Sequence, residues 1–308
     1  MNGVSYRPGY IALHRSGELR KRGEALWKML SDCRLCPREC RVDRLAGETG
    51  FCKATARLRV ASFTPHFGEE RPLVGVGGSG TIFLSHCNLG CLFCQNWDIS
   101  HKGAGTDVEV SDLAGMMLQL QAQGCHNINV VTPTHFSPHV VLALDMAAAN
   151  GLRLPLVYNT SGWERPDILE LLDGIVDIYL ADFKYMDPQH AATYSNEAVD
   201  YPDVTRSALL EMNRQTGVAS PEKNGIIYRG LMIRHLVMPN YVSGSMAAME
   251  WISDHLPLET YVNIMIQYRP AYRAHLYPEI DCSVSVDYYE EVVARARNLG
   301  LTNLDVDI

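Results

Sequence analysis

Beyond Pro72, short apolar runs alternate along the chain with longer segments in which apolar residues recur every three or four positions. The short runs indicate buried strands, and the longer periodic segments indicate amphipathic helices. This alternation is typical of βαβ units that build a parallel sheet. Six strands are predicted, over residues 81–85, 127–131, 154–159, 176–181, 232–237 and 262–266.

Helical segments are predicted between these strands, and several of them end in characteristic residues. Ser111 or Asp112 can cap the first helix, and Gly124, Gly151 and Gly217 stand just beyond the first, second and fourth. The predicted helices cover residues 111–123, 138–150, 167–172, 204–215 and 245–255.

The fold class predicted from this pattern is α/β. Crossovers between parallel strands are right-handed as a rule, so we expect a partial (β/α)6 barrel of the TIM type over residues 73–308. An open doubly wound sheet fits the same pattern and stays as the alternative. Before the barrel, a surface helix over residues 17–30 leads into a loop-like, basic stretch over 33–60. Residues 1–72 are therefore expected to form a small N-terminal metal-binding module.

Charge and composition exclude several classes of protein. The 308 residues include 35 acidic and 27 basic side chains, a formal net charge of −8. Nucleic-acid binding needs clustered Lys and Arg and is disfavoured, although residues 34–59 offer a local basic patch. No apolar run approaches the roughly 18 residues of a membrane span, and the first 22 residues lack the apolar segment of an export signal. We therefore expect a cytoplasmic protein.

The nine cysteines fall into two groups. In a reducing compartment, grouped cysteines are more often metal ligands or redox groups than disulfides. Cys125 and Cys282 stand alone, and each is expected to be a buried small hydrophobic residue and not a nucleophile. The two groups are Cys33, Cys36, Cys40 and Cys52, and Cys87, Cys91 and Cys94.

The second group has the spacing Cys-x3-Cys-x2-Cys on one short loop. Three thiolates can hold three irons of a [4Fe-4S] cluster and leave the fourth iron open to another ligand. Structural clusters and zinc sites normally take four protein ligands, so the vacant position indicates a binding site. The strand over 81–85 places this loop at the C-terminal mouth of the barrel, where active sites of this architecture lie. A half-assembled zinc site or three unrelated buried thiols is the plain alternative.

This segment resembles the cluster motif of the radical S-adenosylmethionine (radical SAM) superfamily. The resemblance implies that SAM chelates the open iron through its amino and carboxylate groups. It also implies that one electron from the cluster breaks the C5′–S bond, and that the resulting 5′-deoxyadenosyl radical abstracts a hydrogen atom. Carried over to this chain, the resemblance makes Cys87, Cys91 and Cys94 the cluster ligands and places Phe93 near the adenine.

Further segments resemble the pyruvate formate-lyase activating enzymes and their uncharacterised relatives with an N-terminal four-cysteine module. They are residues 94–97, which include Asn96, and residues 158–162, 182–184 and 234–240. The resemblance covers nearly the whole chain and implies hydrogen abstraction from a glycine of a partner protein, with flavodoxin or ferredoxin as an electron donor. The nearest alternative is a radical reaction on a small molecule or a ribosomal peptide. The alternative from another class is an iron–sulfur electron-transfer protein.

Several residues at strand ends are candidate SAM ligands. Many superfamily members carry Gly-Gly-Glu after the second strand, where this chain has Val-Thr-Pro-Thr-His at 131–135. Backbone carbonyls from Thr132 to Thr134 can still accept from the SAM ammonium. Asn159 and Ser161 suit the ribose or methionine end of SAM, although Asn, Ser and Gly also build ordinary turns.

Four residues after the fourth strand and within the fifth complete the candidate site. Asp182 can accept a hydrogen bond from SAM or bind a cation, and Lys184 can neutralise a carboxylate; a plain Asp–Lys salt bridge is the alternative. Arg234 suits a carboxylate of SAM or of the substrate. Because side chains alternate along a strand, only one of Arg234 and His235 should face the barrel interior. Lys184, Arg234 and His235 are the candidate catalytic residues, with a buried core role as the alternative for His235.

The N-terminal group, Cys33-x2-Cys36-x3-Cys40-x11-Cys52, provides four thiolates within twenty residues. Four thiolates saturate a tetrahedral zinc ion or all four irons of a cluster, so this site should be closed, with a structural or electron-transfer role. The spacing does not choose between zinc and a second iron–sulfur cluster. A module this small has few apolar residues, so the metal is expected to help it fold.

Overall fold

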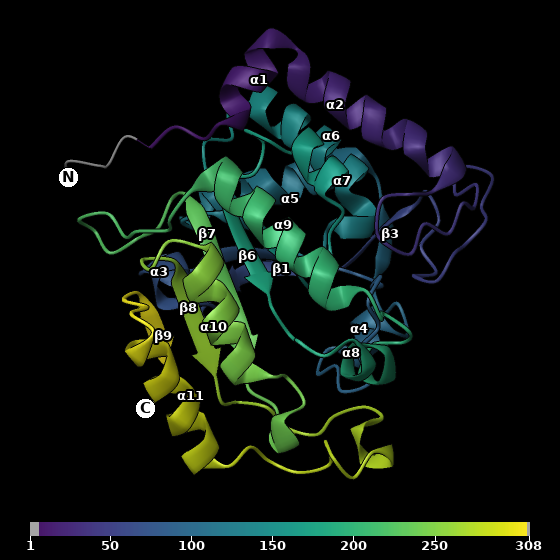
Figure 1. Cartoon of the computed structure of the whole chain (residues 1–308). Helices are drawn as coiled ribbons and strands as arrows, with labels where there is room; N and C mark the ends of the chain where they lie inside the picture. The colour runs from purple at the N-terminus through teal and green to yellow at the C-terminus, as the bar shows by residue number, and fades with distance from the viewer. Residues whose placement is uncertain (1–5, 307–308) are drawn as a thin grey trace.

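The computed structural model describes residues 6–306, so the ends of the two predicted domains, residues 1–5 and 307–308, lie outside the described chain. Within that range the strands form a single nine-stranded sheet in the order β3-β1-β2-β4-β5-β6-β7-β8-β9 (Figure 1). The strands β2 and β4 to β9 are parallel, whereas β1 is antiparallel to both of its neighbours. Their bounds are β1 (Leu58–His66), β2 (Ser79–Leu84), β3 (Thr106–Val108), β4 (Ile128–Val131), β5 (Leu156–Thr160), β6 (Ile178–Asp182), β7 (Gly230–Leu236), β8 (Tyr261–Met265) and β9 (Leu304–Val306).

The six predicted strands are confirmed as β2 and β4 to β8, each with ends within two residues of the prediction. The prediction missed β1, β3 and β9. The strand β1 begins at Leu58, inside the stretch that we expected to be loop-like. Its alternation breaks at a register shift between Val60 and Ser62, and it carries Pro65. β3 and β9 have three residues each, too few to show a period.

The five predicted helices between the parallel strands are confirmed as α5, α6, α7, α9 and α10, the last at the predicted bounds. The prediction missed the short helices α4 and α8 and the 13-residue α11, which also lie between parallel strands. No helix in residues 6–306 is long and apolar enough to cross a membrane. The helices are α1 (Tyr10–Ser16), α2 (Glu18–Lys28), α3 (Arg71–Val74), α4 (Trp97–Ser100), α5 (Val110–Ala122), α6 (Ser137–Ala149), α7 (Pro166–Leu171), α8 (Pro188–Tyr194), α9 (Tyr201–Thr216), α10 (Ser245–His255) and α11 (Val286–Asn298), with single 3-10 turns η1 (Met29–Asp32), η2 (Thr134–Phe136), η3 (Pro239–Tyr241) and η4 (Ala274–Leu276).

The parallel strands follow one another across the sheet in chain order, from β2 to β9. A doubly wound sheet needs a point where the order reverses and helices change face. No such reversal occurs among the described strands, so right-handed crossovers place the connecting helices on one face. The sheet is therefore a partial barrel of the TIM type, and the doubly wound alternative is wrong.

Two hydrophobic clusters cover the two faces of this sheet. On the outer face, residues such as Tyr179 and Ile233 pack with helix residues such as Leu209 of α9. On the inner face, Leu180 and Met232 pack with Leu73 of the short helix α3. Leu73 has no exposed surface, so α3 closes the inside of the barrel on this side.

The N-terminal segment packs on the outside of the barrel. The helices α1 and α2 lie against α6, with α2 running across α6 in Figure 1. The predicted helix over residues 17–30 ends at Lys28 and continues as the 3-10 turn η1 up to Cys33. The division of the chain at residue 72 stays a prediction, and β1 joins the segment before that position to the sheet.

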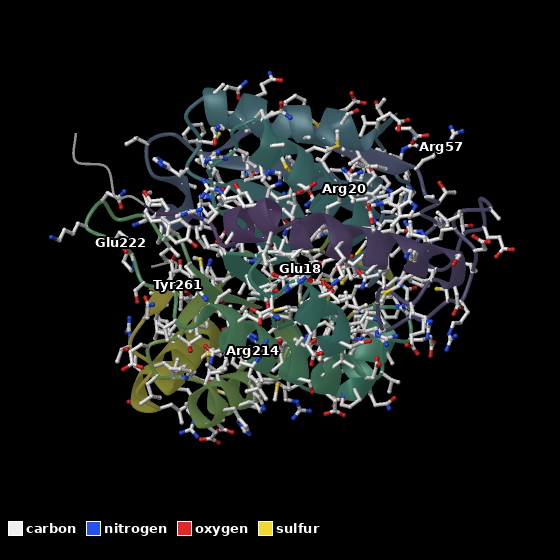
Figure 2. All side chains as sticks on the ribbon, turned by 90° about the horizontal axis from the view of Figure 1, so that it is seen from above. Glu18, Arg20, Arg57, Arg214, Glu222 and Tyr261 are labelled. Carbon is white, nitrogen blue, oxygen red and sulfur yellow. The ribbon has the colours of Figure 1, made fainter. Side chains whose placement is uncertain are left out.

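Charged side chains project from the outer surface of the helices. Arg20 on α2 and Arg214 on α9 are among the side chains labelled in Figure 2. Arg20 pairs with Glu24 at 3.2 Å and Arg214 with Glu211 at 2.7 Å. Exposed pairs of this kind each contribute only about 0–1 kcal/mol, so apolar burial beneath the helices dominates the stability of the fold.

One buried carboxyl group ties together the loops that follow two neighbouring strands. Glu164 has no exposed surface and accepts a hydrogen bond from Thr134 Oγ1, in the loop after β4, at 2.5 Å. Thr160 Oγ1 at the end of β5 also donates to it. Burial raises the pKa of Glu164 from 4.5 to about 7, although both hydroxyl groups oppose that shift. The folded protein thus binds a proton that the unfolded chain releases at lower pH.

Replacing Leu73 by Ala should lower the free energy of unfolding by about 2–5 kcal/mol, because the change leaves a cavity inside the barrel. Urea denaturation followed by circular dichroism measures the change. The same truncation at Leu276, whose exposed fraction is 62%, serves as the matched control and should be nearly neutral. Equal effects of the two substitutions would contradict the role of α3.

The stability difference between Glu164→Gln and the wild type should increase with pH. Glu164 stabilises the folded state, relative to the unfolded chain, fully below pH 4.5; this contribution is lost as pH rises through about 7. The wild type should therefore lose about 3 kcal/mol that the Gln variant keeps. Denaturation at pH 4.5 and pH 8 measures this difference, with the exposed Glu222→Gln as the control. A difference that does not change with pH would show that Glu164 is ionised throughout.

Candidate active site

The three cysteines of the second group lie on one loop at the C-terminal ends of the parallel strands. The loop follows β2 and runs to α4, and its three thiols line a cavity of about 190 Å³. Side chains from the ends of β2, β4, β5, β6 and β7 line the same cavity. From these strands and their following loops come Phe83, Val131, Thr132, Asn159, Thr160, Ser161, Asp182, Lys184 and Arg234.

Each thiol of this loop has a hydrogen-bond donor nearby. Ser195 Oγ lies 3.2 Å from Cys91 Sγ, Ser100 Oγ lies 3.2 Å from Cys94 Sγ, and the Leu89 amide nitrogen lies 3.4 Å from Cys87 Sγ. Donors of this kind stabilise sulfur that carries negative charge, as it does when bound to iron.

The fit of these thiols to a cluster follows from their chemistry and placement. Burial raises the pKa of Cys87 to about 11 and that of Cys91 to about 12, so without a metal both stay protonated near neutral pH. Among the described residues, no three His, Cys, Asp or Glu side chains already meet as a metal site. The three thiols nevertheless face one cavity with donors behind them, which fits a group that binds through three of its irons.

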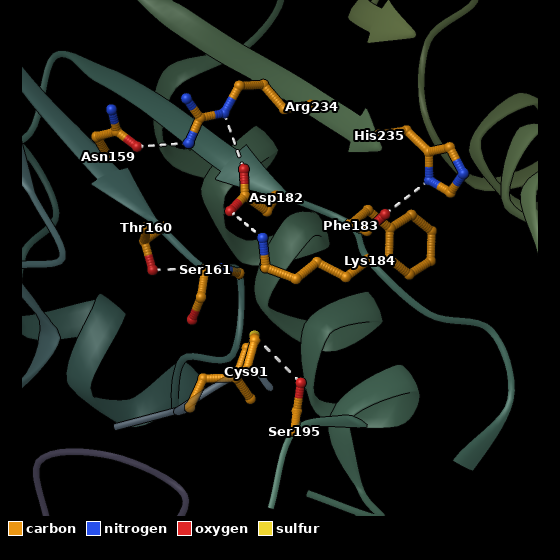
Figure 3. Close-up of polar contacts among 12 residues, drawn as sticks. Cys91, Asn159, Thr160, Ser161, Asp182, Phe183, Lys184, Ser195, Arg234 and His235 are labelled. Atoms are coloured by element: carbon orange, nitrogen blue, oxygen red, sulfur yellow. Dashed lines mark hydrogen bonds and ion pairs between the residues drawn. The ribbon is translucent and has the colours of Figure 1, made fainter. Parts of the chain in front are cut away.

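An ion-pair network lies on the far side of the cavity (Figure 3). Asp182 accepts from Arg234 Nε at 2.8 Å and from Lys184 Nζ at 2.5 Å. Arg234 also donates to Asn159 Oδ1 at 2.7 Å. Burial opposes the charge on Asp182, but Arg234 and Lys184 outweigh it and lower its pKa. Burial likewise opposes the charge on Lys184, but Asp182 outweighs it and raises the pKa of Lys184. Two cations therefore flank Asp182, and Glu69 Oε2 lies 3.8 Å from Arg234 Nη1. Lys184 Nζ, an ammonium with three donors, can still bind a further carboxylate.

Two further candidates present polar groups to the cavity. Ser161 lines it, and the buried Ser161 Oγ has no hydrogen-bond partner within the described chain. Thr132 also lines it and adopts a φ of 58°, which is rare for a β-branched residue. Its amide donates to the Asn159 carbonyl at 2.8 Å, so the loops after β4 and β5 hold this backbone in place. Asn96 lies on the cavity wall as well.

Three predicted site residues do not reach the cavity. Phe93 is buried and packs edge-on against Tyr185 and Tyr268. Thr134 turns toward Glu164, and its carbonyl accepts from the Ser137 amide.

His235 is the third of these residues, since the alternation of β7 directs it to the outer face, toward α10. There it contacts the Phe183 carbonyl at 2.6 Å and Ser245 Oγ at 2.9 Å. Arg234 takes the inner face, and we leave His235 out of the catalytic group.

Sequence reasoning missed three residues at the cysteine loop. His86 lines the cavity at a φ of 73°, and its buried Nδ1 has no partner in the described chain. Its position directly before Cys87 was the available signal. Ser100 follows Cys94 by six residues, whereas Ser195 lies more than one hundred residues from Cys91, and nothing in the sequence pairs these two serines with sulfur.

The N-terminal cysteines line a small cavity of their own. Cys33, Cys36, Cys40 and Cys52 all face it. Arg44 Nη1 lies 3.8 Å from Cys33 Sγ, and the Phe51 amide lies 3.4 Å from Cys40 Sγ. A Cβ on Gly50 would stand 2.6 Å from Cys40 Sγ, so this position needs glycine. The four thiols and their donors form a closed set, in contrast to the three thiols of the barrel loop.

Arg38, which lies between Cys36 and Cys40, holds the barrel loop from the N-terminal side. Its guanidinium donates to the carbonyls of Asn88, Leu89 and Ser195 at 3.1, 3.3 and 3.2 Å. It also stacks on the Phe51 ring at 3.8 Å. The N-terminal cysteine segment therefore positions the loop that carries Cys87 and Cys91.

Comparisons with known proteins agree with this site. The Radical SAM superfamily profile matches residues 81–211, a range that contains the three-cysteine loop. The chain is 30% identical over 283 residues to the uncharacterized protein MJ0674 of Methanocaldococcus jannaschii, which covers 89% of this chain and 76% of that protein. The crystal structure of a radical SAM methyltransferase from Sphaerobacter thermophilus aligns with 96% of this chain and 91% of its own, at 14% identity and a TM-score of 0.45, a level that carries nothing about the reaction. The profile match, the 30% identical relative and the cysteine loop together show that the chain belongs to the radical SAM superfamily.

Proposed function

We propose that this protein is an enzyme that cleaves SAM reductively and abstracts a hydrogen atom from an organic substrate. The observation that carries the proposal is one cavity lined by three thiols of a single loop and by an ion-pair network. Cys87, Cys91 and Cys94 would hold a [4Fe-4S] cluster. When bound, the cluster supplies an electron that breaks the C5′–S bond of SAM and gives the 5′-deoxyadenosyl radical that takes the hydrogen atom.

The other residues of the cavity bind and orient SAM in this proposal. Lys184 and Arg234, which share Asp182, supply the positive charge for the methionine carboxylate. Ser161 Oγ has a free hydrogen-bonding capacity for the ribose or the methionine end. The Thr132 carbonyl is the remaining backbone candidate for the ammonium group, because the Thr134 carbonyl is already used.

A glycine of a partner protein is the first candidate hydrogen donor. The segments 94–97, 158–162, 182–184 and 234–240 support it through their resemblance to the pyruvate formate-lyase activating enzymes. The edge strands β3 and β9 do not pair with each other, so the barrel is open on one side, as entry of a peptide loop requires. Flavodoxin or ferredoxin would supply the electron.

A small molecule is the second candidate hydrogen donor, and a specific feature favours it. A cavity of about 520 Å³ shares Arg234 with the SAM cavity, and its volume is in the range of small-molecule sites.

The N-terminal cysteines are proposed to hold zinc or a second iron–sulfur cluster. Four thiols saturate either group, and their burial together with Arg44 fits a site that no substrate enters. The contacts of Arg38 suggest that this metal also stabilises the position of the barrel loop.

Replacing Cys87, Cys91 or Cys94 by Ala should lower 5′-deoxyadenosine formation by more than about 100-fold. Substitution of a residue that only hydrogen-bonds to a metal ligand already costs about 10–100-fold in metal affinity or activity. The assay uses anaerobically reconstituted protein with SAM and dithionite, and chromatography measures the product. Cys282 is exposed, so the expectation that it is buried is wrong; Cys282→Ala removes a cysteine outside both groups and should retain full activity. Full cleavage in any of the three loop variants would refute the ligand assignment.

Metal analysis should distinguish the two groups. Anaerobically purified protein should contain about four irons with one zinc, or about eight irons, according to the metal at the N-terminal cysteines. Cys36→Ala should remove the zinc or about half of the iron, whereas Cys91→Ala should leave the N-terminal metal in place. Unchanged iron and zinc in Cys36→Ala would contradict the N-terminal site.

A further inference from the structure

A second cavity adjoins the candidate SAM site on the inner face of the barrel. Its volume is about 520 Å³, and Arg234 lines both cavities. The sheet itself connects them, because Asp182, Arg234, Asn263 and Asp305 pair with one another across β6, β7, β8 and β9. Paired positions of neighbouring parallel strands point to the same face, so these side chains form one polar row.

Three carboxyl groups and two guanidinium groups line the wall of the second cavity. Glu69 and Glu70 reach it from the segment between β1 and α3, and Asp305 reaches it from β9. The basic residues on the wall are Arg71 and Arg234, and Arg234 is already bonded to Asp182 at 2.8 Å and lies 3.8 Å from Glu69 Oε2. Asp305 accepts from the Tyr261 hydroxyl.

Glu70 has an unused acceptor in this wall. Its exposed fraction is 7%, and Oε1 accepts from Asn263 Nδ2 at 3.1 Å. Oε2 is buried and has no hydrogen-bond partner in the described chain. A buried carboxylate oxygen without a donor is costly, so the fold retains it at a free-energy cost that a bound donor would offset.

The neighbouring carboxyl group limits the charge of the cavity. Burial raises the pKa of Glu69 to about 7, with Arg234 opposing and Glu70 adding to the shift. Near neutral pH Glu69 is therefore protonated in part of the molecules, and the Arg234 guanidinium faces its ionised form at 3.8 Å. Among the buried side-chain atoms of this wall in the described chain, Glu70 Oε2 is the one without a hydrogen-bond partner.

We infer that this second cavity binds a protonated amine of the substrate, held by Glu70 Oε2 and the adjoining carboxyl groups. The inference rests on the proposed function, since Arg234 then separates the bound SAM from the bound amine. The amine would anchor the substrate while its reacting carbon extends past Arg234 to the cysteine loop. A free alkylamine and the side chain of a peptide lysine share this chemistry.

The test measures binding of four probes to the reconstituted enzyme with SAM present, by ligand-observed NMR. The probes are pentylamine, 1-pentanol, pentanoate and lysine blocked at both backbone ends. Pentylamine or the blocked lysine should bind at least about tenfold more tightly than pentanol, because the ammonium supplies a donor and a positive charge whereas the hydroxyl supplies a donor alone; pentanoate, which supplies neither, should bind least. Tight binding of pentylamine indicates a free amine as substrate, and selective binding of the blocked lysine indicates a peptide.

Glu70→Gln should weaken binding of the cationic probe by at least about tenfold. The matched control is Glu222→Gln, which changes an exposed side chain on the loop after α9 and should leave binding unchanged. Thermal denaturation checks that both variants are folded. If Glu70→Gln does not fold, the comparison of the four probes on the wild type decides.

Different results would contradict the amine site and the proposed function. Equal binding of pentylamine, pentanol and pentanoate, in protein that forms 5′-deoxyadenosine from SAM, would overturn the amine site alone. Absence of 5′-deoxyadenosine from fully reconstituted wild-type protein would overturn the proposed function, and this inference with it.

Discussion

The position of the loop between β2 and α4 depends on backbone hydrogen bonds from distant parts of the chain. Arg38 donates to two of its carbonyls, and the Leu92 amide donates to the Tyr194 carbonyl at 2.8 Å. The Arg273 amide donates to the Leu92 carbonyl at 2.9 Å. A loop this short has few hydrogen bonds of its own, so these partners fix where its three sulfur atoms lie. The N-terminal segment, the region around α8 and the region before η4 therefore all contribute to the site without lining it.

The charged side chains at the ends of β6 and β7 also depend on one another. Asp182, Lys184 and Arg234 are each costly to bury alone; the two cations compensate Asp182, and Asp182 compensates each of them. Removal of one member would leave an unpaired charge inside the barrel mouth. The network thus holds the cations Lys184 and Arg234 at the cavity, in a chain whose overall charge is −8.

The sequence revealed the parts of the fold that repeat a clear period. The apolar runs of β4 to β8 and the helices between them were predictable because both faces of the parallel strands are buried. The sequence did not reveal the antiparallel β1 or the three-residue strands β3 and β9, which carry little periodic signal.

The candidate site was also predictable from the sequence only in part. The thiol spacing and strand-end positions identified Cys87, Asn159 and Asp182, all of which line one cavity. The orientation of Phe93 and the contacts of Arg38 depend on tertiary packing, which spacing does not encode.

The shortness of the two outermost strands has a consequence for how the molecule behaves in a crowded mixture. A long, unpaired edge strand is a template to which other chains can add by backbone pairing, and natural proteins reduce this risk by keeping edge strands short. With three residues each, β3 and β9 expose few unpaired amide and carbonyl groups. The barrel can therefore stay open on one side, where a substrate can enter, without presenting a long edge strand that promotes aggregation.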